Sequence, residues 1–594
     1  MKNAIHHLNN STLDLLRSRF KNVHALTDAN KEMLNLSCVD NFFLTESDLR
    51  LFLEYIEPRP ELADTKPRRE YGDFQTPLDL CQTVCSTIKN CDPSILVEPT
   101  FGKGSFILTA IETFPTLKHV YGVEIHESYC WHTKFAILEL FLDKPNLNHP
   151  LISLYCDDVF KFDFQKLNES FGPSTLLVLG NPPWVTNSEL SVLKSNNLPT
   201  KSNFKSHNGL DAITGKGNFD IGEYIILMML DAFSERTGSL AMLAKNTVIK
   251  NVVQDLPNTN HSISNLLALK FDTKQYFNAA VDASLFKCSF GQKDLSLSCK
   301  VAPLDYPAST ESVFGWVEDK FVSDIDMYKN SKIFDSTSPF VWRQGVKHDC
   351  SKILELDFVN GVYKNGFADE LDIEDDLIYP LVKSSDIQNS PLSIPRKFVI
   401  VTQKKVGEDI TYIANKYPRL NQYLSSHLKF FSDRKSSIYN GKSEYAIFGI
   451  GEYSFKPFKV AISGLYKKSF FSLVKPYNGK PTMLDDTCYF LGFDDYSHSI
   501  FASLILNSEP AQNLLRSLSF IDSKRPYTKD ILMRVDLLRV ANYLGFNNIY
   551  ERATGLSDDI LQLVTQENWE AFLSSCNGKL QNAPQFSLTF PKAV

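Results

Sequence analysis

The sequence predicts an α/β protein built around a mostly parallel β-sheet, and two observations lead to this prediction. Between about residues 71 and 290, short apolar runs alternate with helix-like stretches, and the loops between them are short. Alternation of this kind is typical of parallel sheets that carry helices on both faces. The 594-residue chain is also 43% hydrophobic and 22% charged, ordinary values for a protein that buries large cores without disulfide or metal staples.

Changes in pattern divide the chain into three regions, 1–70, 71–330 and 331–594. The first has apolar residues at helical spacing in Leu13–Phe20 and Asp48–Ile56, so we expect a helical extension that ends in a proline-bearing, charged linker. In the last region, aromatic-rich runs broken by Gly, Pro and Ser predict mixed or mainly β structure. Two further helices are expected near its end, at Ile531–Leu544 and Asp558–Phe572.

The middle region contains the strands of the predicted sheet. Each is a short apolar run bounded by turn-forming residues. The expected strands are Ser94–Val97, His119–Ile125, Leu151–Tyr155, Thr175–Leu179 and Ser239–Leu243, with helices at Ser105–Thr113 and Glu223–Phe233.

A glycine loop follows the first of these strands. Glu98 and Pro99 end the strand, and Gly102 and Gly104 precede the helix. Glycines at this position let the backbone approach a ligand closely at the carboxyl edge of a sheet. The spacing is not that of an ATPase phosphate loop. Taken alone, the segment is also compatible with an ordinary strand–helix turn.

Carboxylates follow the next two strands. Glu124 lies at the tip of the second strand, where it could accept hydrogen bonds from ribose hydroxyls. Asp158, preferred over Asp157, follows the third strand and could accept from the exocyclic amine of an adenine. The alternatives are a solvated carboxylate at Glu124 and an Asx-type turn at Asp158.

The most specific signal is the corner after the fourth strand. There Asn181, Pro182, Pro183 and Trp184 follow Gly180 directly. The prolines fix φ and have no N–H donor, so carbonyl groups and the Asn181 amide oxygen can accept hydrogen bonds from an NH₂ group. Trp184 offers a flat face on which a ring can stack.

Together, these motifs resemble those of class I S-adenosylmethionine-dependent methyltransferases, and most closely the enzymes that methylate adenine N6 in DNA. The family pattern of Asn, Asp or Ser followed by Pro-Pro and an aromatic residue is met by Asn181–Trp184. The resemblance implies a Rossmann-like domain, S-adenosylmethionine as cofactor, a cofactor loop at Glu98–Gly104, and Glu124 and Asp158 as ribose- and adenine-binding acids. The motif order is that of the γ group of these enzymes.

Two further segments are similar to family elements. Gln75, Thr76 and Pro77 match the segment that holds the methionine end of the cofactor. Phe277 matches the position of a second aromatic residue against the target base, and its neighbour Tyr276 would serve equally.

The resemblance implies a restriction–modification or phage-defence enzyme that methylates adenine N6 in double-stranded DNA. Adenine in a duplex must leave the base stack to reach such a site. Asn181 and the Pro182 carbonyl would then accept hydrogen bonds from its amino group, while Trp184 stacks on the ring. The region 331–594 would recognise the target sequence, and any cleavage would need a separate restriction endonuclease. The alternatives are an RNA or protein-glutamine methyltransferase and a non-catalytic DNA-binding subunit.

Charge is distributed unevenly along the chain. Residues 401–480 contain fourteen Lys and Arg against five Asp and Glu, a local charge of +9 in a chain whose total is −7. Lysines interleaved with aromatic residues suit a phosphate-facing surface. The alternative is a solvated basic face unrelated to DNA.

Other classes of protein are disfavoured. The eleven cysteines contain no CxxC pair and the histidines show no metal-ligand pattern, so we expect a reduced protein without a metal. The longest apolar stretch, near Tyr224–Leu230, is far too short to span a membrane, and the first residues do not resemble a signal peptide. We therefore expect a cytoplasmic protein.

Overall fold

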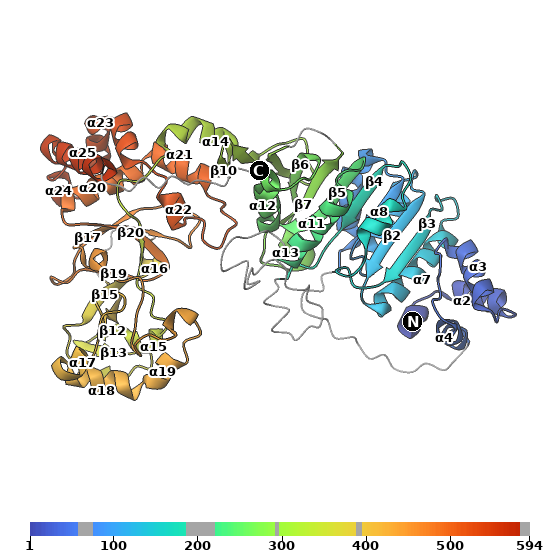
Figure 1. Cartoon of the computed structure of the whole chain (residues 1–594), viewed down its shortest axis with the longest axis horizontal. Coiled ribbons are helices and arrows are strands. Elements are labelled where there is room, and N and C mark those ends of the chain that lie inside the picture. The colour runs from blue at the N-terminus through green and yellow to red at the C-terminus, as the bar shows by residue number, and fades with distance from the viewer. Residues whose placement is uncertain (58–74, 186–219, 292–295, 388–394, 582–594) are drawn as a thin grey trace. The chain divides into compact units, whose positions relative to one another are not determined.

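The computed structural model contains two compact units, Met1–Phe321 and Val322–Val594, which are described separately (Figure 1). The structure describes residues 1–57, 75–185, 220–291, 296–387 and 395–581. Most of the expected linker after the N-terminal helices lies outside these residues.

The first unit is organised by a ten-stranded sheet, counted over the described residues, in the order β10-β9-β8-β6-β7-β5-β4-β1-β2-β3. Strands β1 to β5 are parallel, which confirms the predicted parallel sheet and its five strands. The order changes direction between β1 and β4, so their carboxyl ends flank a crevice of the kind in which doubly wound sheets bind ligands. These strands are β1 (Ile95–Glu98), β2 (His119–Glu124), β3 (Leu151–Cys156), β4 (Leu176–Gly180) and β5 (Gly238–Lys245).

Beyond β5 the sheet becomes mixed. Strand β7 inserts antiparallel between β5 and β6, and β8 then pairs parallel with β6. The bounds are β6 (Ile263–Lys270), β7 (Ala283–Phe290), β8 (Ser298–Pro303), β9 (Ser312–Val317) and β10 (Lys320–Val322).

Helices connect the strands, and their ends follow local sequence signals. Helix α6 begins directly after Gly104, and Asp220 caps α11 by accepting a hydrogen bond from Gly222 N–H at 3.0 Å. The expected helices at Ser105–Thr113 and Glu223–Phe233 are confirmed. The helices of this part are α5 (Leu78–Thr87), α6 (Ser105–Thr113), α7 (Glu127–Asp143), α8 (Phe164–Glu169), α11 (Ile221–Phe233), α12 (Asn246–Asp255) and α13 (Thr273–Phe277).

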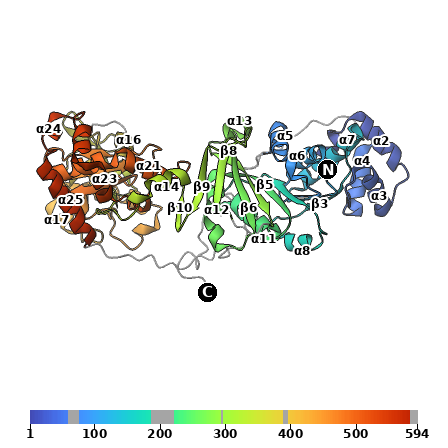
Figure 2. The ribbon, with the colours of Figure 1, turned by 90° about the horizontal axis from the view of Figure 1, so that it is seen from above.

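The N-terminal helices belong to the same compact unit and lie beside α7 (Figure 2). Phe42 contacts Trp131 and Phe135 of α7, with ring centroids 6.1 and 5.4 Å apart. Val39 forms a parallel bridge with Ile152 of β3, so this segment covers the outer edge of the sheet. The helices are α1 (Lys2–His6), α2 (Asn10–Phe20), α3 (Leu26–Ser37) and α4 (Glu46–Ile56), and α2 and α4 confirm the two predicted stretches.

The second unit combines two sheets, with strand orders β11-β20-β17-β18 and β14-β13-β12-β16-β15-β19. Mixed structure was expected here and is observed. The strands are β11 (Arg343–Gln344), β12 (Glu355–Val359), β13 (Val362–Lys364), β14 (Glu370–Leu371), β15 (Ile378–Val382), β16 (Lys397–Ile400), β17 (Phe458–Ser463), β18 (Ser472–Val474), β19 (Met483–Leu484) and β20 (Cys488–Phe493).

Each of the two expected C-terminal helices is in fact a pair. The first is broken at residues 533–536, where the Asp536 carboxylate caps the following helix, and the second is broken at 562–565. The helices of this unit are α14 (Ile325–Ser331), α15 (Ser351–Leu354), α16 (Ser384–Ile387), α17 (Tyr412–Lys416), α18 (Pro418–Ser426), α19 (Leu428–Ser432), α20 (Tyr496–Leu506), α21 (Glu509–Leu518), α22 (Lys529–Leu532), α23 (Leu537–Ala553), α24 (Asp558–Leu561) and α25 (Gln566–Gln581).

Lys459 in β17 is an unusual member of this second core, because its side chain is almost completely buried. Its ammonium donates to the Lys456 carbonyl at 2.6 Å, and burial lowers its pKa from 10.5 to about 7. Between these two values the unfolded chain binds a proton that the folded chain does not, so stability rises with pH across this window.

We therefore expect Lys459→Met to stabilise the protein most at or below pH 7, where the folded state carries the buried charge. The gain should approach about 1.4 kcal/mol per unit of pKa depression, less the lost hydrogen bond, and it should shrink toward pH 10. Thermal unfolding across this pH range measures it. Lys456→Met, which removes a half-buried lysine paired with Asp494, is the matched control. An equal gain at pH 7 and pH 10 would contradict the role given to the buried charge.

Candidate active site

Polar residues converge at the carboxyl edge of the parallel strands. Glu98 and Glu124 are the last residues of β1 and β2, Asp158 follows β3 after one intervening residue, and Asn181 directly follows β4. Because these strands are parallel neighbours, their ends meet at one edge of the sheet. The structure thus brings together the residues that the sequence predicted for cofactor and catalysis.

The glycine loop needs its glycines for space as well as for conformation. Gly102 and Gly104 have φ values of +55° and +77°, which favour glycine. A Cβ on Gly102 would lie 2.8 Å from Gln75 Oε1, and one on Gly104 would lie 2.4 Å from Thr133 Cγ2. Thr133 of α7 was not identified from the sequence, since only the fold brings it to the loop.

Glu124 is held by the backbone around it. Its carboxylate accepts from Gly102 N–H at 2.9 Å and from His126 N–H at 2.8 Å, and these two bonds reach different oxygens. The glycine loop and Glu124 therefore fix each other's position.

Glu98 is the most deeply buried of these acids, with 2% of its surface exposed. Its Oε2 atom has no hydrogen-bond partner among the described residues. Burial raises its pKa well above the ordinary value, the nearby charge of Glu124 adds to this, and a hydrogen bond from the Ile107 backbone opposes it. A buried, incompletely satisfied carboxyl group beside a second carboxylate fits a cationic ligand such as S-adenosylmethionine.

Asp158 lies in a turn. Its Oδ1 accepts from Phe160 N–H at 3.0 Å, which is the Asx-type geometry considered above, and its Oδ2 is 3.6 Å from Lys161 Nζ. Its side chain is 13% exposed, whereas Asp157 is exposed. The structural role of Asp158 is thus observed, and its adenine-binding role stays a prediction.

The corner after β4 is fixed from two sides. The Asn181 amide nitrogen donates to Thr76 Oγ1 at 3.2 Å, which joins the corner to the Gln75–Pro77 segment. On the other side α11 packs closely, because a Cβ on Gly222 would lie 3.5 Å from both Pro182 Cγ and the Pro183 carbonyl oxygen.

An ion pair also supports this side of the corner. Lys245 at the end of β5 lies 2.7 Å from Asp220, the N-cap of α11. Burial raises the pKa of Asp220, and the hydrogen bond from Lys245 opposes this rise. The sequence signal available for Asp220 was its position before an apolar helix, but its partner could not be found from spacing.

Trp184 and Phe277 lie against each other. Both are buried, and their rings meet edge to face with centroids 5.0 Å apart. Tyr276 instead packs against Phe271, with centroids 6.1 Å apart. A base held between two rings needs a separation of about 7 Å, twice the carbon contact distance. Stacking a base between Trp184 and Phe277 therefore requires these rings to separate.

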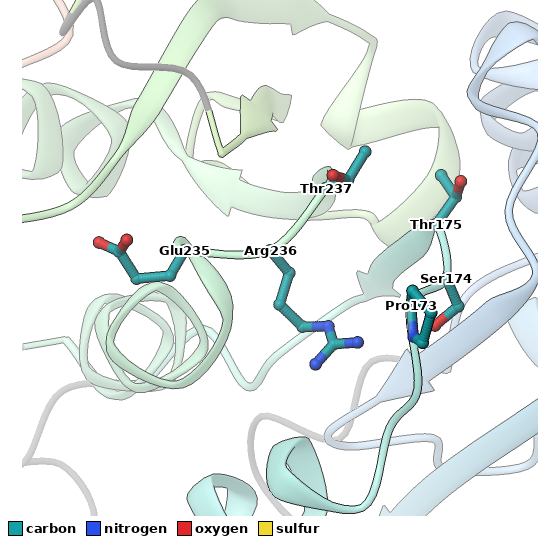
Figure 3. A pocket seen from close by; sticks show the side chains of 6 residues that line it. All are labelled: Pro173, Ser174, Thr175, Glu235, Arg236 and Thr237. Carbon is teal, nitrogen blue, oxygen red and sulfur yellow. The ribbon is translucent and has the colours of Figure 1, made fainter.

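One surface cavity of about 470 Å³ lies elsewhere (Figure 3). Thr175 and Thr237 in its wall directly precede β4 and β5, so it lies at the amino ends of these strands. Arg236, also in the wall, donates to the Asn168 side chain at 3.0 Å and stacks on Phe171, which gives it a structural role. The full lining is Pro173, Ser174, Thr175, Glu235, Arg236 and Thr237.

Metal-binding clusters and membrane-spanning helices are both absent from the described residues. No group of three or more His, Cys, Asp or Glu side chains in them is arranged to hold a metal ion. Within the same residues, the helices include none with the length and apolar character of a membrane span.

The sheet order, with the glycine loop after β1 at its switch point, defines a class I methyltransferase domain and confirms the predicted fold class. The chain belongs to the Type II methyltransferase family of restriction–modification systems. It is 37% identical over 475 residues to the Type II methyltransferase M.NspV of Nostoc sp. (strain ATCC 29411 / PCC 7524), a match that covers 80% of this chain and 97% of that protein. No protein-family model matches the chain.

Solved structures show a more distant likeness. The Type IIL restriction–modification enzyme MmeI in complex with DNA has a TM-score of 0.48 at 11% identity, covering 87% of this chain and 74% of its own. The type IIG restriction endonuclease BpuSI has a TM-score of 0.35 at 14% identity, covering 86% and 67%. At these scores and identities, the likeness establishes neither an activity nor a partner for this chain.

The raised pKa of Glu98 makes the stability of the fold depend on pH. A carboxyl group whose folded pKa is raised binds more protons in the folded than in the unfolded state, so stability falls as pH rises from about 4.5 toward the folded pKa. Glu98→Gln removes this titration. In the cofactor-free protein, we expect the melting temperature of Glu98→Gln to rise relative to that of the wild type as pH increases. Each kcal/mol of relative stabilisation should correspond to about 2–4 °C.

Differential scanning calorimetry between pH 5 and pH 9 tests this expectation. The matched control is Glu169→Gln, the same change at an exposed residue of α8, which should leave the pH profile unaltered. A constant difference between Glu98→Gln and the wild type at every pH would refute the raised pKa of Glu98.

Proposed function

We propose that this protein transfers a methyl group from S-adenosylmethionine to the N6 amino group of an adenine in duplex DNA. The observation that carries the proposal is the Asn-Pro-Pro-Trp corner, which lies at the same sheet edge as Glu98 and Glu124 and is tied to Thr76. An amino-group acceptor site thus lies beside the predicted cofactor site. Membership of a methyltransferase family supports the same reaction.

S-adenosylmethionine, when bound, supplies an electrophilic methyl group on a sulfonium. Glu98 and the glycine loop would hold its cationic methionine end, together with Gln75, Thr76 and Pro77. Glu124 would accept from the ribose hydroxyls and Asp158 from the adenine amine. The neighbouring carboxyl groups at β1 and β2 suit the positive charge of this ligand.

At the corner, Asn181 and the Pro182 carbonyl would accept hydrogen bonds from the amino group of the target base. These bonds would favour a tetrahedral nitrogen whose lone pair could accept the methyl group, so the contribution of these residues rests on positioning and polar stabilisation. Thr76, by accepting from the Asn181 nitrogen, turns the amide so that its oxygen serves as the acceptor. Pro183 stiffens the corner.

The target adenine would leave the duplex and stack on Trp184, with Phe277 moving aside or pairing on its other face. The contact between these two rings favours Phe277 over Tyr276 as the second aromatic residue. The second unit, which carries the basic segment 401–480, would recognise the DNA target. In a restriction–modification system, a separate endonuclease would then cut unmethylated sites.

Transfer of label identifies the substrate. We would incubate the protein with tritiated S-adenosylmethionine and, in separate reactions, mixed duplex DNA, RNA or a protein mixture, then digest each product to nucleosides or amino acids. Label in N6-methyladenosine is the expected result. Label confined to RNA or to protein glutamine would replace the proposed substrate, and cofactor binding without any transfer would indicate a non-catalytic subunit.

Asn181→Ala should lower the rate of this transfer by at least about a hundredfold, because a transition-state hydrogen bond is lost. Cofactor affinity, measured by calorimetry, should stay within a few-fold of the wild type. The matched control is Asn146→Ala, the same change at an exposed residue that follows α7. Wild-type turnover in Asn181→Ala would remove the corner from the mechanism.

A further inference from the structure

The basic segment 401–480 does not form one continuous cationic surface. Several of its cations are occupied within the fold. Lys459 is buried, and Arg434 donates to the Ala446 and Glu444 carbonyls at 2.7 and 2.8 Å. Three more pair with carboxylates, namely Arg419 with Asp372, Lys456 with Asp494 and Lys475 with Asp559. A phosphate-binding surface must therefore come from the cations that are left.

The loop between β17 and β18, residues 464–470, supplies two of these. Lys467 and Lys468 are exposed and form no ion pair with another described residue. The loop has no acidic residue, and Leu465 and Phe470 are 38% and 44% exposed beside the lysines. Exposed cations and apolar groups thus share one short segment.

This loop is held firmly by its neighbours. Gly464 N–H donates to the Thr487 carbonyl at 2.9 Å, and the buried Tyr527 hydroxyl donates to the Lys467 carbonyl at 3.0 Å. The Ser469 hydroxyl donates to the side-chain oxygen of Gln512 in α21. Little backbone entropy remains to be lost when a ligand binds here, so the loop backbone is preorganised.

Lys524 and Arg525 precede Tyr527 by three and two residues in the chain, and Lys524 is exposed. Arg525 donates to the Asp486 carbonyl at 3.0 Å, next to the Thr487 carbonyl that anchors the loop. The Asp486 carboxylate lies 4.0 Å from Arg525 and 3.9 Å from Lys347, which offset its charge. Lys347 also pairs with Asp349 at 2.7 Å. Five cations (Lys347, Lys467, Lys468, Lys524 and Arg525) therefore stand against three acids (Asp349, Asp486 and Asp522), an excess of two positive charges.

We propose that loop 464–470, together with Lys524 and Arg525, contacts the phosphate backbone of the duplex DNA that the enzyme methylates. We call these residues the 464–470 surface. The inference rests on the proposed function and names a DNA-contacting surface for it. Lys467 and Lys468 would replace counterions on the phosphates, and Leu465 and Phe470 would contact the sugars between them.

The test compares the salt dependence of DNA binding in full-length variants. Each phosphate contact contributes about 0.9 to the slope of log affinity against log salt. We expect Lys467→Ala/Lys468→Ala to lower the slope by about 2 and to weaken binding at least about tenfold at low salt. Fluorescence anisotropy on a mixed-sequence duplex measures both quantities. Both side chains are exposed, so melting temperature should not change.

The matched control is Lys21→Ala/Lys31→Ala, which removes the same charge from exposed positions of the N-terminal helices and should leave the slope unchanged. An unaltered slope in Lys467→Ala/Lys468→Ala, in a protein that still labels DNA, would overturn the 464–470 surface alone. A wild-type protein that neither binds nor labels duplex DNA would instead overturn the proposed function. A KM for DNA that rises while kcat is retained would support a binding role.

Discussion

Two carboxyl groups buried side by side dominate the candidate site. Glu98 and Glu124 end neighbouring parallel strands, and 2% and 7% of their surfaces are exposed. Burial of like charges is costly unless a cation or hydrogen bonds offset it. Glu124 obtains two backbone donors, whereas Glu98 keeps an oxygen without a partner among the described residues and has a raised pKa. The fold thus buries two neighbouring carboxyl groups whose charges repel each other, and a cationic ligand would stabilise their charged forms.

The same edge of the sheet joins the cofactor loop to the corner through consecutive residues. Gln75 accepts from Lys103 N–H at 3.0 Å, inside the glycine loop, and Thr76 accepts from the Asn181 amide at 3.2 Å. One short segment therefore contacts both the loop that would hold the donor and the side chain that would hold the acceptor. Small shifts of this segment would change the distance between the cofactor loop and the Asn181 side chain. The position of the segment therefore controls how donor and acceptor would be aligned.

Local patterns predicted the part of the fold that carries the site. Strands β1 to β4 were found because apolar runs end at polar residues, and those polar residues are the predicted ligands. The first of the two long C-terminal helices was wrongly predicted as continuous, because helical periodicity runs across residues 533–536. In the structure, Asp536 caps a new helix there. Thr133 beside Gly104 and Lys245 beside Asp220 could not be predicted, since both contacts depend on how distant elements pack. The position of Phe277 was identified, but not its contact with Trp184.

The distribution of charge over the surface, like the packing contacts, could be predicted only in part from the sequence. A count over residues 401–480 treats Lys459 and Lys467 alike, although one is buried in β17 and the other is exposed on the next loop. A buried lysine with a pKa of about 7 contributes little to the field outside the protein, and a lysine paired with a carboxylate contributes less than its formal charge. Composition therefore predicts the kind of partner, whereas burial and pairing decide which residues can meet it. Two of the available cations, Lys467 and Lys468, lie on a loop whose backbone is already fixed by hydrogen bonds.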